Sequence, residues 1–162
     1  MTAYFEFNDE LHQLLLKLDE EPDPELDDTS EPNLDYEDLS RRIEKVKPCL
    51  EDVSCYRLIR DDMQDCFYAA DLGVWKKYPD EKGFFALYVV TFSYLGRIAT
   101  VTANYPGVCV SMETKKKTAE CLEKYGFVFV DSDILDNAKY DGKREWFLNN
   151  GASWADRLFG CS

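Results

Sequence analysis

The chain has 162 residues, of which 45% are hydrophobic and 14% aromatic, a composition that suits one globular domain with a sizeable core. Its net charge of −13 makes nucleic acid and anionic membrane surfaces unsuitable partners, because both are bound mainly through Lys and Arg. The N-terminal residues lack the basic and apolar regions of a signal peptide, and no apolar run is long enough to span a membrane, so we expect a cytoplasmic protein.

The charge is distributed unevenly along the chain. Residues 1–40 hold fourteen acidic side chains and one basic side chain, whereas the remaining 122 residues hold eighteen of each. We therefore predict an acidic N-terminal arm over residues 1–34 and a single globular domain over residues 35–162. Such asymmetry is typical of a protein that meets a charged partner or carries a solvating tail.

The arm is predicted to contain a helix and a linker. Asn8 is a good N-cap for a helix over residues 8–20, along which leucines recur at i, i+3, i+4 and i+7. We expect the globular domain to cover this apolar stripe, with a partner protein as the alternative. Residues 21–34 are rich in proline and acids and poor in apolar side chains, which predicts an extended or disordered linker. The leucines of the stripe are Leu11, Leu14, Leu15 and Leu18.

The globular domain begins with a helix predicted over 35–47, which we expect Pro48 to end because proline lacks a backbone N–H. Leu95 and Gly96 mark a hairpin between the two strongest strand segments. The strands are predicted at 53–60, 66–75, 84–94, 97–103, 108–111 and 127–130, and further helices at 113–125, 143–149 and 153–159. This order predicts an α+β fold with a mostly antiparallel sheet of four to six strands and helices packed on one face.

The six cysteines include no C-x-x-C pair. Without an export signal they are expected to be free thiols in a reducing compartment. A structural zinc site needs closely spaced Cys and His ligands, and His12 is the one histidine of the chain. We therefore predict no metal site and no cofactor, and we expect His12 to lie at the surface.

Asp131 and Asp133 directly follow an apolar segment, which is the most suggestive local pattern. Two carboxylates at a strand tip can bind Mg²⁺ or hold a phosphoryl group. The alternative, which we favour, is that Asp131 or Asp133 caps a short turn at 134–138. A calcium loop around Asp141 fails on spacing, because Leu148 would stand where the loop needs a bidentate Glu. We predict a protein that is not an enzyme, and a metal-dependent enzyme using Asp131, Asp133 or Asp141 is the least favoured alternative.

The remaining signals favour binding to another protein. In size, charge and lack of catalytic residues the chain is similar to the small acidic cytosolic proteins with which bacteria neutralise toxins. We expect a protein-binding module, in the form of an immunity-type inhibitor of a basic toxin or nuclease. The alternative is an accessory or regulatory domain with a solvating acidic tail. Seven acids of the arm and three aromatic side chains are predicted to contact the partner: Asp19, Glu20, Glu21, Asp23, Glu25, Asp27, Asp28, Tyr36, Trp75 and Trp146.

Overall fold

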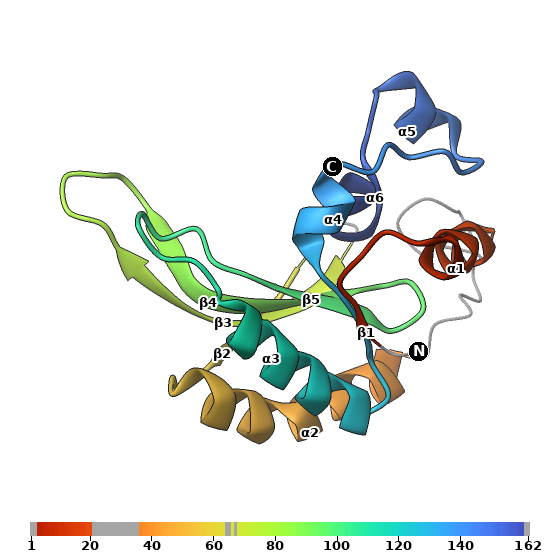
Figure 1. The fold of residues 1–162 in the computed structure, drawn as a ribbon. Coiled ribbons are helices and arrows are strands. Elements are labelled where there is room, and N and C mark those ends of the chain that lie inside the picture. Colours follow the sequence, from red (N-terminus) through yellow and green to blue (C-terminus); the bar gives the residue numbers. More distant parts are fainter. Residues whose placement is uncertain (1–2, 21–35, 64–65, 67, 161–162) are drawn as a thin grey trace.

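The computed structural model of the chain describes residues 3–20, 36–63, 66 and 68–160. Its centre is a six-stranded sheet with the order β1-β6-β5-β4-β3-β2 (Figure 1). The strands are β1 (Ala3–Tyr4), β2 (Ile59–Asp62), β3 (Tyr68–Lys77), β4 (Phe84–Ser93), β5 (Ile98–Thr102) and β6 (Val128–Val130). β6 pairs in parallel with β1 and β5, and the other pairs are antiparallel. The predicted α+β fold with a mostly antiparallel sheet is confirmed.

Helices lie on both faces of the sheet, and not on one face as the sequence predicted. α2 (Tyr36–Ser54) and α3 (Met112–Lys124) lie side by side on one face (Figure 1). The other face carries α1 (Asp9–Asp19), α4 (Ser132–Asp136) and α6 (Trp154–Phe159), with α5 (Glu145–Asn149) further out. The prediction was wrong because the apolar stripe of a helix shows that it packs against a sheet but not against which side.

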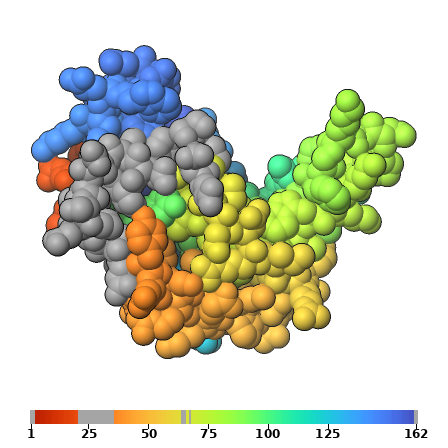
Figure 2. All heavy atoms as spheres, turned by 180° about the vertical axis from the view of Figure 1, so that it is seen from behind, coloured from red at the N-terminus to blue at the C-terminus, as the bar shows by residue number. Residues whose placement is uncertain are grey.

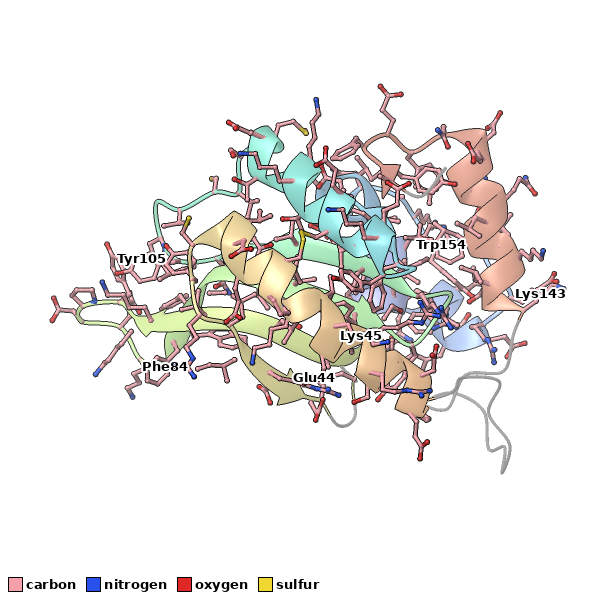
Figure 3. The ribbon with its side chains drawn as sticks, turned by 90° about the horizontal axis from the view of Figure 1, so that it is seen from below. Glu44, Lys45, Phe84, Tyr105, Lys143 and Trp154 are labelled. Carbon is pink, nitrogen blue, oxygen red and sulfur yellow. A yellow bond between two sulfur atoms is a disulfide. The ribbon has the colours of Figure 1, made fainter. Side chains whose placement is uncertain are left out.

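The face under α2 and α3 is an apolar core. Val46 and Leu50 of α2 and Leu122 of α3 are fully buried against Val90 and Phe129 of the sheet. A disulfide between Cys49 and Cys121 joins the two helices, with their Cα atoms 5.9 Å apart, and its sulfur atoms are visible between the helices in Figure 3.

The prediction of free thiols is therefore wrong for Cys49 and Cys121, and also for Cys66, which is buried and disulfide-bonded. Cys55 and Cys109 are free and exposed. Cys49 and Cys121 lie 72 positions apart in the sequence, so no local pattern marks them as a pair. Only the packing of α2 beside α3 brings the two sulfur atoms within bonding distance.

The leucine stripe of α1 is covered by the body of the protein, as expected. Leu11, Leu15 and Leu18 are buried in a second apolar cluster that includes Ile98 and Trp154. Asn8 caps α1 by accepting a hydrogen bond from the backbone N–H of Leu11 at 2.9 Å. β1 and α1 are thus built into the same fold as residues 36–160. The predicted linker at 21–34 lies outside the described residues.

α2 does not end at Pro48 but continues to Ser54. A proline inside a helix removes one backbone hydrogen bond and costs about 3 kcal/mol. Here Val46 and Leu50 bury their side chains on either side of it, and the disulfide holds Cys49 next to it. This tertiary packing outweighs the loss, so the strand predicted at 53–60 is shortened to β2, which begins at Ile59. Residues 108–111 form no strand.

Candidate binding cleft

The helices on the second face leave part of β3 and β4 open, which forms a cleft of about 420 Å³. Its floor comes from β3, β4 and β5, and α4 and α6 form one wall. Figure 2 shows the hollow between the C-terminal helices, coloured blue, and the projecting hairpin of β3 and β4, coloured green. Strands place alternate side chains on opposite faces, so the residues of this floor alternate with those of the apolar core.

A row of polar side chains crosses the floor of this cleft. Asp71 on β3 pairs in register with Thr91 on β4, and Thr91 pairs with Thr100 on β5. All three side chains line the cleft. Asp61 on β2 extends the row beyond Asp71. The register of the sheet therefore gathers four polar residues that are far apart in the sequence.

Asp71 is a partly buried carboxylate that has no cationic partner among the described residues. Its Oδ1 accepts a hydrogen bond from Thr91 Oγ1 at 2.7 Å. Among the described residues, no Lys, Arg or His forms an ion pair with it. Burial raises the pKa of Asp71 to about 6, and the negative charge of Asp61 adds to this, while the hydrogen bond from Thr91 opposes it. The carboxylate is still mostly ionised at neutral pH.

Thr100 is the second unusual group of the floor. Its side chain is 2% exposed, and its Oγ1 has no hydrogen-bond partner within the described part of the chain. A buried hydroxyl without a partner costs about 1–3 kcal/mol. The hydroxyl of Thr91, its neighbour in the row, donates its hydrogen bond to Asp71. The inner part of the cleft therefore has hydrogen-bonding capacity that the protein does not use.

Trp75 lies along the floor because its neighbour on the same face is a glycine. A Cβ atom at Gly73 would be 2.9 Å from Cη2 of the Trp75 indole and 2.9 Å from Val89. The ring therefore extends back along β3 over Gly73, toward Asp71. Tyr68 completes this side of the cleft, and burial together with the charges of Asp71 and Asp61 raises its pKa to about 12, so it keeps its proton.

The wall of the cleft adds further negative charge. Asp136 of α4 and Asp156 of α6 both line the cleft and are exposed. Burial and the neighbouring carboxylates of Asp133, Asp156 and Asp131 raise the pKa of Asp136. No Lys, Arg or His lines the cleft among the described residues, and the sequence has none of these side chains outside them. The cleft is therefore strongly acidic.

Asp19 lies inside the protein, although the sequence predicted it as a contact for a partner. Its carboxylate accepts hydrogen bonds from Arg157 Nε at 2.7 Å, Tyr140 OH at 2.5 Å and the backbone N–H of Lys143 at 3.1 Å. Arg157 and Asp19 are both buried. Glu20 is exposed and forms an ion pair with Lys143 at 2.8 Å. The other predicted acids lie outside the described residues: Glu21, Asp23, Glu25, Asp27 and Asp28.

The three predicted aromatic contacts lie in different places. Trp75 lines the cleft. Tyr36 at the start of α2 is 42% exposed and packs edge-on against Tyr94. Trp146 on α5 is 54% exposed and packs against Phe147. Neither Tyr36 nor Trp146 lines the acidic cleft.

The polar row on the floor of the cleft was not predicted from the sequence. Asp71 interrupts an otherwise apolar segment that runs from Tyr68 to Trp75, and Thr91 interrupts another that runs from Phe84 to Phe92. An acid inside an apolar strand is a signal for a functional or paired group, because burying an unpaired charge is costly. The strand register, which places Asp71 beside Thr91, is not visible in the sequence.

Asp131 and Asp133 both form ion pairs with Lys115. Asp131 caps α4 by accepting from the backbone N–H of Asp133 at 3.1 Å, which confirms the capping interpretation. Lys115 Nζ lies 3.0 Å from Asp131 and 2.9 Å from Asp133. Asp141 accepts from Trp154 Nε1 at 3.1 Å and contacts His12 Nε2 at 2.7 Å. Each carboxylate considered for a metal site is thus engaged by other side chains.

Comparisons with protein-family models, curated proteins and solved structures gave no match, so function is inferred from the residues themselves. Within the described residues, none of the helices has the length and apolar character needed to cross a membrane. What defines the class of this molecule is an α+β fold with an acidic cleft on the open half of its sheet.

Proposed function

We propose that this protein is a non-enzymatic protein-binding module whose acidic cleft receives a basic segment of a partner protein. The supporting observation is that Asp71, Asp136 and Asp156 line one cleft in which the described residues place no basic side chain. A concave surface of one charge concentrates ligands of the opposite charge and speeds their association. The dimensions also suit a ligand, since binding pockets enclose about 300–1,000 Å³.

An immunity-type inhibitor of a basic toxin or nuclease is the form of this function that the charge favours. Nucleases hold phosphate groups with Lys and Arg, so an acidic protein can occupy the same surface. The net charge of −13 and the acids of residues 21–35 favour such a partner. The accessory-domain alternative differs in one respect: its acidic N-terminal segment would keep the protein soluble without contributing to partner binding.

The test compares two triple variants that remove equal charge. One variant carries Asp71→Asn, Asp136→Asn and Asp156→Asn, which neutralise the cleft. The control carries substitutions to Gln at three exposed acids of α3: Glu113, Glu120 and Glu123. The probe is a peptide of alternating Arg and Gly, titrated calorimetrically at low salt.

We expect the cleft variant to bind about tenfold more weakly than the wild type, and the control to change by less than about twofold. The affinity of the wild-type protein should also fall as salt is added, because exposed charges are screened. Equal losses in the two variants would show that net charge alone drives binding. Absence of any binding by the wild type would overturn the proposed function.

A further inference from the structure

Within the described part of the chain, the two fully buried carboxylates are paired with cations of the protein itself. Asp19 receives Arg157 at 2.7 Å, and Asp131 receives Lys115 at 3.0 Å. The partly buried Asp71 is the exception: within the described residues, its carboxylate accepts a side-chain hydrogen bond from the neutral hydroxyl of Thr91 and none from a cation. Buried charges are normally paired, because an isolated ion in a low-dielectric environment is costly. The open cleft above Asp71 is the place from which a cation can approach.

The polar row requires a ligand with several donors. Asp71 accepts, Thr91 has lone pairs left after donating its proton, and Thr100 Oγ1 is unpartnered within the described residues. An ammonium group is a compact, strongly hydrated point charge, whereas a guanidinium offers five N–H donors in one plane and is weakly hydrated. Arginine is therefore the basic side chain that best matches neighbouring acceptors on adjacent strands.

Trp75 supplies a surface for the rest of such a side chain. Its indole lies over Gly73, two residues from Asp71 on the same face of β3. The aliphatic part of an arginine packs along an aromatic ring, and its guanidinium is attracted to the ring face. A side chain that lies along Trp75 thus brings its charged end toward Asp71.

We propose that the cleft is a recognition site for an arginine side chain of the partner protein, with Asp71 and Thr100 binding the guanidinium and Trp75 contacting the stem. This inference rests on the proposed function and names the residue type that is recognised. The rim acids Asp136 and Asp156 attract the basic segment, and the row on the floor selects arginine from other cations.

Acidification should release the ligand. Asp71 titrates near pH 6, and protonation removes the charge that holds the guanidinium. The groups that face or flank Asp71 are Asp61 on β2, Tyr68 on β3, Thr91 on β4, and the rim acids Asp136 and Asp156. The pKa of Asp136 is also raised, so protonation of Asp136 weakens the attraction in the same direction as protonation of Asp71. Between about pH 7 and pH 5 we expect a loss of affinity of about threefold or more, as for Asp71→Asn, because only about a tenth of Asp71 stays ionised at pH 5.

The experiment uses three peptides that alternate glycine with arginine, lysine or citrulline. Citrulline has the shape of arginine without its charge, and lysine keeps the charge without the planar group. Binding is followed by two-dimensional NMR, which also reports where the peptide binds. We expect the arginine peptide to bind about fivefold or more tightly than the lysine peptide, and the citrulline peptide to be weakest.

Single variants locate the site. Asp71→Asn and Thr100→Val should each weaken binding of the arginine peptide by about threefold or more. Each should also reduce the ratio of the affinities for the arginine and lysine peptides. Glu113→Gln on the exposed side of α3 is the control and should change neither quantity. Thermal melting of each variant shows that it is folded, and neither floor substitution is expected to lower the melting temperature.

The outcomes separate this inference from the proposed function. Equal affinity for arginine and lysine peptides, or a loss confined to a double variant of Asp136 and Asp156, would overturn the arginine site and leave the binding function standing. If no basic peptide binds to the wild-type protein, both are overturned. NMR shifts concentrated at residues 71, 91 and 100, and lost in Asp71→Asn, would support the site.

Discussion

The two faces of the central sheet differ in whether their buried polar groups have partners. On the face covered by α2 and α3, even the buried polar groups are matched, as where Tyr88 and Thr118 share a hydrogen bond of 2.8 Å. On the open part of the other face, among the described residues, the partly buried Asp71 has no cationic partner and the buried hydroxyl of Thr100 has no hydrogen-bond partner. Polar groups without partners lower the stability of the folded state, and in an otherwise well-packed protein they are typical of functional sites. The following substitutions test that contrast, from the largest expected effect to the smallest.

Asp19→Asn should cause the largest change. It leaves the buried guanidinium of Arg157 without its carboxylate, and breaking a buried ion pair costs about 3–5 kcal/mol. The free energy of unfolding, measured by urea denaturation, should fall by about that amount. Glu20→Gln is the matched control: its ion pair with Lys143 is exposed, so we expect a change of less than about 1 kcal/mol. Similar effects at the two positions would contradict a structural role for Asp19.

Removal of the disulfide tests the covered face. The double variant Cys49→Ala and Cys121→Ala releases a bridge between positions 72 residues apart, which should cost about 3 kcal/mol by increasing the entropy of the unfolded chain. The control replaces the two exposed free thiols, Cys55 and Cys109, with serine, and should change stability by less than about 0.5 kcal/mol. A double alanine variant as stable as the wild type would show that the bridge does not stabilise this face.

Asp71→Asn should raise stability, in contrast to the loss at Asp19. The pKa of Asp71 is raised from 3.8 to about 6 in the folded protein, so the folded state disfavours the ionised form. This cost is absent below about pH 4, grows as the pH rises toward 6, and reaches about 2–3 kcal/mol at neutral pH. The asparagine keeps an oxygen for Thr91 and removes the charge.

The gain at Asp71 should therefore appear at neutral pH and vanish near pH 4 in urea denaturation. Asp131→Asn is the control for a partnered carboxylate: it leaves the buried ammonium of Lys115 with one acid instead of two and should lower stability. A loss of stability at Asp71 at neutral pH would contradict an unpaired buried charge.

Thr100→Val and Thr118→Val give the smallest and most direct comparison of the two faces. Valine keeps the shape of threonine and removes the hydroxyl. At Thr100 the hydroxyl has no partner among the described residues, so we expect a gain of about 1 kcal/mol in the free energy of unfolding. At Thr118 the substitution removes the bond to Tyr88 and should cost about 1 kcal/mol. Effects of equal sign would remove the distinction between the faces.

The sequence by itself determined several local elements of this protein, although not the end of α2 or the start of β2. The leucine spacing and Asn8 predicted α1, and the apolar segments around Gly96 predicted the hairpin of β4 and β5. The prediction that Asp131 or Asp133 acts as a cap is confirmed, and the structure shows that the cap of α4 is Asp131. These features depend on the period of an element and on hydrogen bonds between residues a few positions apart, so the sequence shows them directly.

Only the tertiary structure decided which distant residues meet. Asp19 accepts a hydrogen bond from Arg157, which is 138 positions away in the sequence, and Cys49 forms a disulfide with Cys121, which is 72 positions away. The row of Asp71, Thr91 and Thr100 exists because the register of three strands aligns it. Such contacts follow from how elements pack and pair, and a register different by one residue would turn these side chains to the other face. The acidic N-terminal sequence indicated a charged partner, but the packing of the helices left open the cleft in which we place it.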